Sequence, residues 1–274
     1  MCLFKKSKNV LVADIGATNT NFAVLNDKFN IIYKKDIKTK EIHNFSSTLH
    51  ELLAEPAVKK LAVYKACFAV AGPINRERTS AQGTNIAWKV DIIELKKTTH
   101  LKQILLINDF EAIGFAVDVL KPEQYKEITS FGRNINGTTA IIGAGTGLGM
   151  SILADLGTKH LPIASEGGHT DLQIDTTNTL EVKFAKYLQS KKIIMDYENS
   201  AVCGRGIVIL YKFLLTQKLK HSTNIKKQIE NANYEEKPAI ITNEAMKGKD
   251  YLCVKTVDLF IKLYARAARN LVLT

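Results

Sequence analysis

The sequence predicts a mixed α/β protein, and three observations favour this fold class. Short apolar runs bounded by turn residues occupy the first half, beginning with Val10–Ile15, and such runs indicate strands. Further along the chain, Leu180, Phe184 and Leu188 lie four residues apart, a spacing typical of helices. The chain has 274 residues, of which 46% are hydrophobic. It is therefore long enough for one large domain or two smaller ones.

Charge and cysteine content narrow the classes of partner and location. The formal net charge is +11, which favours an anionic small molecule such as ATP as a ligand. The lysine pairs are short and scattered and no nucleic-acid-binding motif occurs, so we expect no nucleic-acid partner. No apolar run reaches about 18 residues, and no secretory signal is recognisable. With four cysteines far apart in the sequence, this predicts a cytoplasmic protein with free thiols and no membrane partner.

The first candidate site follows the strand predicted at Val10–Ile15. The turn after this strand consists of Gly16, Ala17, Thr18 and Asn19. Its backbone N–H groups and short polar side chains suit a phosphate group, and Asp14 beside it suits Mg²⁺, held directly or through water. The chain then continues as a strand, Asn21–Leu25, whereas a dinucleotide-binding fold would open a helix after a G-x-G-x-x-G turn. Taken alone, the segment also fits a tight turn without a ligand.

A second glycine turn follows the strand predicted at residues 138–142. Glycine weakens strand interiors, so four glycines at alternate positions between residues 143 and 149 indicate a backbone that approaches a ligand closely. The residues expected to contact that ligand are Gly143, Gly145, Thr146 and Gly147. Two such turns would hold a polyphosphate from two sides, as in the actin-like ATPases. The P-loop motif G-x-x-x-x-G-K-[ST] does not occur.

Two polar segments complete the set of candidate sites. Asn108 and Asp109 end the apolar strand predicted at Gln103–Ile107, where Asp109 is either the N-cap of the following helix or a general base. Glu166 and His169 flank two glycines, and their side chains could each bind sugar-like hydroxyls. A turn with a solvated Glu and a structural His is the alternative for this segment alone.

Together these four segments resemble the bacterial glucokinase family of the actin-like sugar kinases. The matching stretches follow the family's order from residue 11 to residue 211. They are LVADIGATNTNFAVL (11–25), FAVAGPI (68–74), TNIAW (84–88), LLINDFEAIGFAV (105–117), IGAGTGLGMSIL (142–153), EGGHTDL (166–172) and YENSAVCGRGIVILY (197–211). The resemblance implies a two-domain actin-like ATPase (ribonuclease H-like) fold, with a small domain at residues 1–108 and a larger one at residues 109–274.

The resemblance also implies roles for individual residues. The aspartate of the family's INDF stretch, here Asp109, takes the proton of the sugar 6-hydroxyl. The residues that would bind sugar hydroxyls are Asn85, Asn108, Glu166, His169 and Glu198. The first glycine turn is similar to the family's phosphate-1 loop and the second to its phosphate-2 loop, so with Asp14 they would bind ATP and Mg²⁺. Ala17 stands where the family usually has a second glycine.

The activity implied by the resemblance is that of a glucokinase. Such an enzyme uses ATP to convert glucose to glucose 6-phosphate, the first step of glycolysis, in the cytoplasm. A related branch of sugar kinases binds zinc through a C-x-C-G stretch, which this sequence lacks. Dimers are common in the family, and a homodimer is left open here.

The C-terminal end of the sequence departs from the family pattern. A last helix is predicted to bury one stripe of apolar residues, namely Val254, Val257, Ile261, Tyr264, Ala268 and Leu271. The family continues beyond this point with a glycine-rich turn of the adenosine pocket and a further helix, so we expect the C-terminal part of the fold to be missing. Two interpretations follow, an active hexose kinase or a catalytically impaired sugar-binding remnant. Glucose calorimetry beside a coupled kinase assay separates them.

Overall fold

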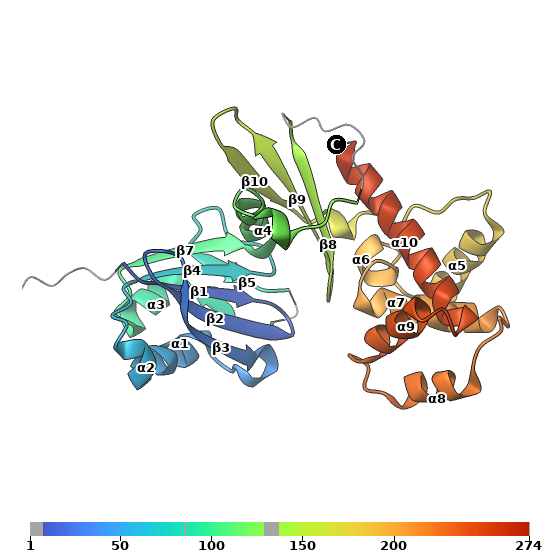
Figure 1. Cartoon of the computed structure of the whole chain (residues 1–274), viewed down its shortest axis with the longest axis horizontal. Helices are drawn as coiled ribbons and strands as arrows, with labels where there is room; N and C mark the ends of the chain where they lie inside the picture. Colours follow the sequence, from blue (N-terminus) through green and yellow to red (C-terminus); the bar gives the residue numbers. More distant parts are fainter. Residues whose placement is uncertain (1–7, 85, 129–136, 274) are drawn as a thin grey trace, which may run out of the picture. The chain divides into compact units, whose positions relative to one another are not determined.

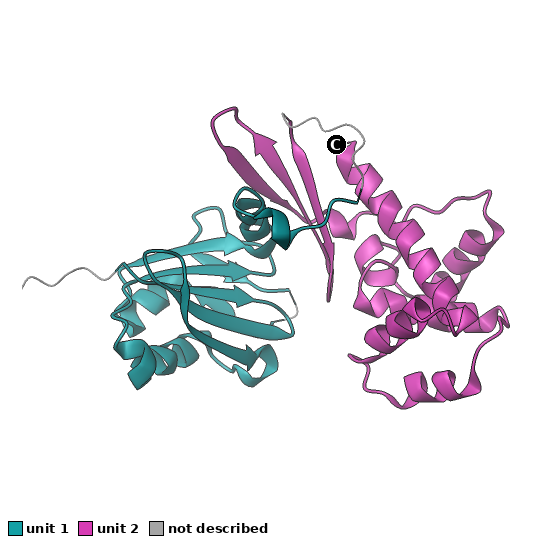
Figure 2. Cartoon of the chain, viewed as in Figure 1, with its two compact units in different colours: residues 1–131 teal, residues 132–274 magenta. Residues whose placement is uncertain are grey.

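A computed structural model describes residues 8–84, 86–128 and 137–273 of the chain (Figure 1). The chain divides into two compact units, residues 1–131 and residues 132–274, drawn in teal and magenta in Figure 2. Helix α4 (Asp109–Val117) falls in the first unit because it packs on two strands of that unit's sheet. The domain limits expected from the family resemblance, 1–108 and 109–274, stay a prediction.

A five-stranded sheet forms the centre of the first unit, in the order β3-β2-β1-β4-β7. Strands β1, β2 and β3 are antiparallel neighbours, whereas β1, β4 and β7 run parallel. The strand bounds are β1 (Val10–Ile15), β2 (Asn19–Leu25), β3 (Ile31–Lys38), β4 (Lys65–Val70) and β7 (Gln103–Asn108). The predicted strand–turn–strand start is confirmed, because β1 and β2 pair directly with each other.

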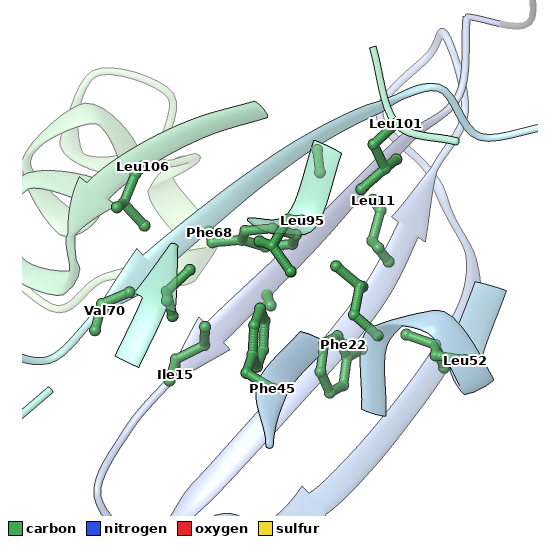
Figure 3. Packing of buried hydrophobic residues seen from close by; sticks show 14 of the residues in the cluster. Leu11, Ile15, Phe22, Phe45, Leu52, Phe68, Val70, Leu95, Leu101 and Leu106 are labelled. Carbon is green, nitrogen blue, oxygen red and sulfur yellow. The ribbon is translucent and has the colours of Figure 1, made fainter. Parts of the chain in front are cut away.

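One face of this sheet is covered by α1 (Phe45–Ala54) and α3 (Ile92–Thr98), which share one hydrophobic cluster with the strands. Figure 3 shows this packing, with Phe45 beside Phe22 and Phe68. The Phe45 ring also stacks on the ring of Trp88, with centroids 5.1 Å apart. The alternation of β1 buries Leu11, Ala13 and Ile15 and leaves Asp14 exposed, as expected for a strand with one covered face.

Shorter elements complete the first unit. They are η1 (Thr39–Glu41), α2 (Pro56–Lys59), β5 (Ser80–Gln82), β6 (Lys89–Asp91) and η2 (Pro122–Gln124), with β5 and β6 paired antiparallel. The helix predicted up to Glu55 ends at Ala54, and Pro56 begins α2 as its first residue. Proline suits that position because the first helical N–H has no partner inside the helix.

The second unit combines a three-stranded antiparallel sheet with helices. The sheet has the order β10-β9-β8 and consists of β8 (Thr139–Ala144), β9 (Leu148–Asp155) and β10 (His160–Ser165). The short η3 (Gly167–His169) follows β10. The helices are α5 (Thr179–Ser190), α6 (Tyr197–Ser200), α7 (Gly204–Thr216), α8 (Thr223–Asn231), α9 (Lys237–Met246) and α10 (Tyr251–Val272). Helix α10 packs against α7, α9 and β8.

The buried face of α10 differs from the predicted stripe. The residues that it buries are Leu252, Cys253, Thr256, Leu259, Leu263, Ala267 and Leu271. Of the predicted stripe, only Leu271 counts as buried, and Ile261 is 56% exposed. The prediction was wrong by about one position because α10 carries apolar residues on adjacent faces, and contacts with α7 and α9 select which of them face inward.

A charge cluster joins α5 to α10. The Glu181 carboxylate is fully buried and receives Arg266 Nη1 at 2.7 Å, Arg266 Nη2 at 3.2 Å and Lys262 Nζ at 2.7 Å. The Asp175 backbone N–H donates to the same carboxylate at 2.8 Å. Burial alone would raise the pKa of Glu181, but these hydrogen bonds outweigh it and lower the pKa to about 2. The sequence analysis did not foresee this cluster.

Two simpler expectations concern the membrane and the cysteines. Among the described helices, none combines the length and the apolar character needed to cross a membrane. Cys67, Cys203 and Cys253 are free thiols, the last two of them buried. Burial raises the pKa of the Cys203 thiol, as expected for a structural cysteine.

Candidate functional site

The first glycine turn joins β1 to β2 and is held by residues from outside it. The Gly16 N–H donates to the Asn19 carbonyl at 3.0 Å. The buried Thr39 donates its hydroxyl to the Gly16 carbonyl at 2.6 Å and its N–H to the Thr18 carbonyl at 3.1 Å. These bonds fix the turn from one side and leave Thr18 and Asn19 exposed. Ala17, which precedes Thr18, is half-buried.

Asp14 lies one residue before the carboxyl end of β1, with its side chain on the exposed face of the sheet. The Asn21 side-chain amide donates to its carboxylate at 3.4 Å. The Asn19 side-chain oxygen accepts from Lys38 Nζ at 2.8 Å, so a cation lies beside the turn. Asp14 and the turn therefore lie next to each other at the carboxyl end of β1, and their binding of Mg²⁺ and phosphate stays a prediction.

Asn108 and Asp109 lie at the carboxyl end of β7, where the strand passes into α4. The N-cap of α4 is Asn108, whose side-chain oxygen accepts from the N–H groups of Phe110 and Glu111 at 2.9 and 3.2 Å. Of the two roles considered for Asp109, the N-cap is therefore wrong, and Asp109 is the first residue of the helix. Asn108 Nδ2 also donates to the Gly72 carbonyl at 3.2 Å.

An ion pair between the half-exposed Arg78 and the buried Glu111 supports this strand-to-helix turn. Glu111, whose side chain is 9% exposed, completes a capping box by accepting from the Asn108 N–H at 3.4 Å. Arg78 Nη1 lies 3.0 Å from Glu111 Oε2 and 3.3 Å from the Leu106 carbonyl. Arg78 has a φ of 53°, a left-handed conformation unusual for a residue other than glycine. Sequence reasoning missed both residues because they lie 33 positions apart.

The segment around residue 85 is described only in part. Asn85, a predicted sugar-binding residue, lies outside the described residues. Its neighbour Thr84 donates its N–H to the Ala71 carbonyl at 2.8 Å. Gly72 has a φ of 151°, and a Cβ there would lie 2.6 Å from the Gln82 carbonyl oxygen, so only glycine fits this crossing of two backbones.

In the second unit, the second glycine turn joins β8 to β9, but it is shorter than predicted, because Gly143 lies in β8 and Gly149 in β9. The two strands pair from Ala144 with Leu148 outward, so Gly145, Thr146 and Gly147 form the tip. A Cβ on Gly145 would meet nothing within 4 Å, whereas a Cβ on Gly147 would lie 2.8 Å from Glu198 Oε1. The glycine at position 147 therefore has a packing reason within the chain, the close approach of Glu198.

Glu198 connects this turn to the segment Glu166–His169. Its Oε2 accepts from the Leu148 N–H at 3.1 Å and lies 3.8 Å from His169 Nε2. Gly168 also packs closely against Leu148, because a Cβ at position 168 would lie 2.1 Å from the Leu148 carbonyl oxygen. The structure thus brings His169, Glu198 and the phosphate-2 loop candidate together. Glu166, at the start of η3, is exposed.

A polar chain that the sequence analysis missed lies behind His169. Asp196 is the N-cap of α6, and its Oδ2 lies 3.3 Å from His169 Nδ1. Asn199 donates to the same oxygen at 2.6 Å and accepts from Arg205 Nη2 at 2.9 Å. The D-Y-E-N spacing, which puts Asp196 two residues before Glu198, is the only signal in the sequence that could have indicated it.

The predicted residues thus fall into two sets. The first unit carries the phosphate-1 turn, Asp14, Asn108 and Asp109 at the carboxyl ends of parallel strands. The second unit carries the phosphate-2 turn, Glu166, His169 and Glu198 around η3 and α6. Among the described residues, no group of three or more His, Cys, Asp or Glu side chains has a geometry that could hold a metal ion.

The mixed sheet of the first unit and the two strand-joining glycine turns fit the actin-like ATPase fold, and the solved structures described next show that this is the fold of sugar kinases. The structure of a glucokinase from an Antarctic psychrotroph is similar, with a TM-score of 0.71 and 28% identity over 97% of this chain and 79% of that one. The fold is shared by a ROK family glucokinase from Streptomyces griseus, solved with glucose and AMPPNP. For that structure the TM-score is 0.62 and the identity 16%, covering 96% of this chain and 78% of that one.

The chain belongs to the glucokinase family, since the family model described as glucokinase matches residues 11–274. A glucokinase from Trichormus variabilis is 31% identical over 278 aligned residues, which cover 96% of this chain and 80% of that protein. The family resemblance expected from the sequence is thereby confirmed.

Proposed function

We propose that this protein is an ATP:hexose 6-phosphotransferase that converts glucose to glucose 6-phosphate. The observation that carries the proposal is the turn from β7 into α4, where Asn108 caps the helix and Asp109 follows it. Asn108 supplies the cap, while Asp109 Oδ1 accepts from the Phe110 N–H at 3.0 Å, which places the Asp109 carboxylate at the start of α4. Family membership and the glucose and AMPPNP bound by the Streptomyces griseus protein support the choice of substrates.

Asp109 acts as the general base in this proposal. It accepts the proton of the sugar 6-hydroxyl as the hydroxyl oxygen attacks the γ-phosphorus of ATP. Phosphoryl transfer needs little covalent chemistry from the protein, so positioning and charge stabilisation provide most of the rate. The bonds within the Arg78–Glu111–Asn108 group hold the backbone of this turn in place.

The sugar hydroxyls are bound by Asn85, Asn108, Glu166, His169 and Glu198. His169 and Glu198 are the best supported of these, because His169 Nε2 and Glu198 Oε2 lie only 3.8 Å apart. A hydroxyl can donate to one group while it accepts from another. Carboxylates and imidazoles are therefore suitable partners for adjacent hydroxyls on one ring.

The phosphates of ATP are bound by the two glycine turns, through Gly16, Ala17, Thr18 and Asn19 in one and Gly143, Gly145, Thr146 and Gly147 in the other. Mg²⁺, when bound, neutralises charge on the phosphates. Mg²⁺ usually binds through one or two carboxylates together with water and substrate phosphates. The exposed carboxylate of Asp14, beside the first turn, fits that requirement.

The test is a coupled assay for glucose 6-phosphate with the parent chain and with Asp109→Asn. The variant should bind glucose like the parent and lose about 10²–10⁴ in turnover, the usual scale for removal of a general base. Asp118→Asn, at the other end of α4, is the matched control. Turnover of Asp109→Asn within about threefold of the parent value would remove Asp109 from the mechanism.

A sugar-binding remnant without kinase activity is the second candidate. It would bind glucose in a calorimeter and release no glucose 6-phosphate at any ATP concentration.

The free thiols of Cys67, Cys203 and Cys253 fit a reducing compartment. We therefore also propose a cytoplasmic role in glycolysis.

A further inference from the structure

We propose that Asp196 is a positioning residue, which keeps a proton on Nδ1 of His169 and so presents Nε2 to the sugar. The proposal rests on the proposed function, in which His169 binds a sugar hydroxyl. It assigns a role to a buried carboxylate that takes no part in the steps described above.

The contacts of Asp196 show that both of its oxygens act as acceptors. Its side chain is 8% exposed. Oδ1 accepts from the Asn199 N–H at 2.5 Å, and Oδ2 accepts from Asn199 Nδ2 at 2.6 Å. His169 Nδ1 lies 3.3 Å from the same Oδ2. A carboxylate has no proton to donate, so the bond to His169 forms only if Nδ1 carries the proton.

The orientation of Asn199 is set by its other neighbour. Arg205 Nη2 lies 2.9 Å from Asn199 Oδ1, and a guanidinium only donates. The amide oxygen must therefore face Arg205 and the amide nitrogen must face Asp196. Asn199 Nδ2 also lies 3.5 Å from His169 Nδ1, but it is 2.6 Å from Asp196 Oδ2, so we assign its proton to the carboxylate. Arg205, Asn199, Asp196 and His169 thus form one hydrogen-bonded series.

The hydrogen bonds at Nδ1 determine whether Nε2 of His169 acts as a donor or an acceptor. Nε2 lies 3.8 Å from Glu198 Oε2, too far for a direct hydrogen bond. In the neutral ring with Nδ1 protonated, Nε2 is an acceptor beside a second acceptor, the Glu198 carboxylate. A hydroxyl group supplies the donor that this pair lacks. Glu198 keeps its own place through the bond from the Leu148 N–H.

The substitution Asp196→Asn tests the proposal, because asparagine retains the N-cap function. Its oxygen would accept from the Asn199 N–H, and its NH₂ group would then take the place of Oδ2 and face both His169 Nδ1 and the Asn199 NH₂ group. His169 Nδ1 would lose its proton and become an acceptor, so the neutral ring would change to the Nε2–H tautomer. Long-range ¹H–¹⁵N correlations of the imidazole, assigned by comparison with His169→Gln, report this change directly.

We expect Nδ1 to be protonated in the parent and unprotonated in Asp196→Asn. KM for glucose should rise about tenfold or more, the effect of one lost hydrogen bond, with kcat within about threefold. The control is Asp250→Asn. Asp250 is also a buried N-cap in the second unit, bonded to the N–H groups of Cys253 and Ser222. Its variant should change neither the His169 tautomer nor KM.

An Nε2–H tautomer in the parent, or an unchanged tautomer and KM in Asp196→Asn, would overturn the proposal. The tautomer is measured without substrate. A parent chain that phosphorylates no sugar would therefore refute the proposed function and leave the state of His169 as a separate result. Thermal unfolding followed by circular dichroism checks that Asp196→Asn and Asp250→Asn are folded.

Discussion

Removing the charge of Glu181 should destabilise the second unit, and the size of the effect follows from its contacts. The carboxylate is fully buried and bonded to Arg266, Lys262 and the Asp175 N–H. Its pKa is lowered from an ordinary value of 4.5 to about 2. One pKa unit corresponds to about 1.4 kcal/mol, so the ionised form stabilises the folded state by about 3 kcal/mol. Glu181→Gln, which keeps the side-chain shape, should cost about that much at pH 7.

The stabilisation that ionised Glu181 gives to the folded state should decrease as the pH falls. A group whose pKa is lower in the folded state stabilises that state above its unfolded pKa, and the contribution is lost as the pH falls through the folded pKa. For Glu181 the loss begins near pH 4.5 and continues to about pH 2. The difference in free energy of unfolding between the parent and Glu181→Gln should therefore be smaller by about 1.5 kcal/mol at pH 3.5 than at pH 7.

Urea unfolding followed by far-ultraviolet circular dichroism measures this effect, because helices α5–α10 belong to the second unit. The only tryptophan, Trp88, lies in the core of the first unit, so its fluorescence reports that unit separately. The control is Asp258→Asn on α10, whose ion pair with Lys255 has side chains 55% and 43% exposed. An exposed pair contributes less than about 1 kcal/mol. The reasoning is wrong if Glu181→Gln lowers the free energy of unfolding no more than Asp258→Asn does. It is also wrong if the difference between Glu181→Gln and the parent stays constant with pH.

Three further substitutions test the remaining parts of the structure. Gly168→Ala would place a Cβ 2.1 Å from the Leu148 carbonyl oxygen. It should cost about 1–3 kcal/mol in urea unfolding, whereas Gly137→Ala, which meets nothing within 4 Å, should be neutral. Glu166→Ala should weaken glucose binding about 10- to 150-fold in calorimetry and leave ATP binding unchanged; the opposite pattern would show that the two subsites are interchanged. Arg78→Met leaves the buried Glu111 without its cation and, because Arg78 itself is half-exposed, should lower stability by about 1–2 kcal/mol in the Trp88 fluorescence transition. The pair Lys89–Asp91, whose side chains are 60% and 23% exposed, supplies the control Lys89→Met. An equal loss of stability in both variants would contradict a special role for Arg78.

Many of the strands and turns could be predicted from the sequence because their signals are local. The alternation in Val10–Ile15, the glycines at 143–149 and the proline at 56 each act within a few residues. The order of the strands that carry Asp14 and Asn108 could not be predicted from such local signals, because it depends on pairing between β1, β4 and β7. The roles of the candidate site residues came from the family resemblance, and they stay predictions.

By itself, the sequence determined the fold class, the family and the segments in which the candidate site lies. The tertiary structure decided which side chains pair within each unit. Glu181 meets Arg266 across 85 positions, Arg78 meets Glu111 across 33, and Asp196 meets His169 across 27. No local pattern marks such pairs, because a buried charge is tolerated only where folding brings its partner within hydrogen-bonding distance. For the same reason the inward face of α10 was settled by its packing against α7 and α9, and not by its own apolar spacing.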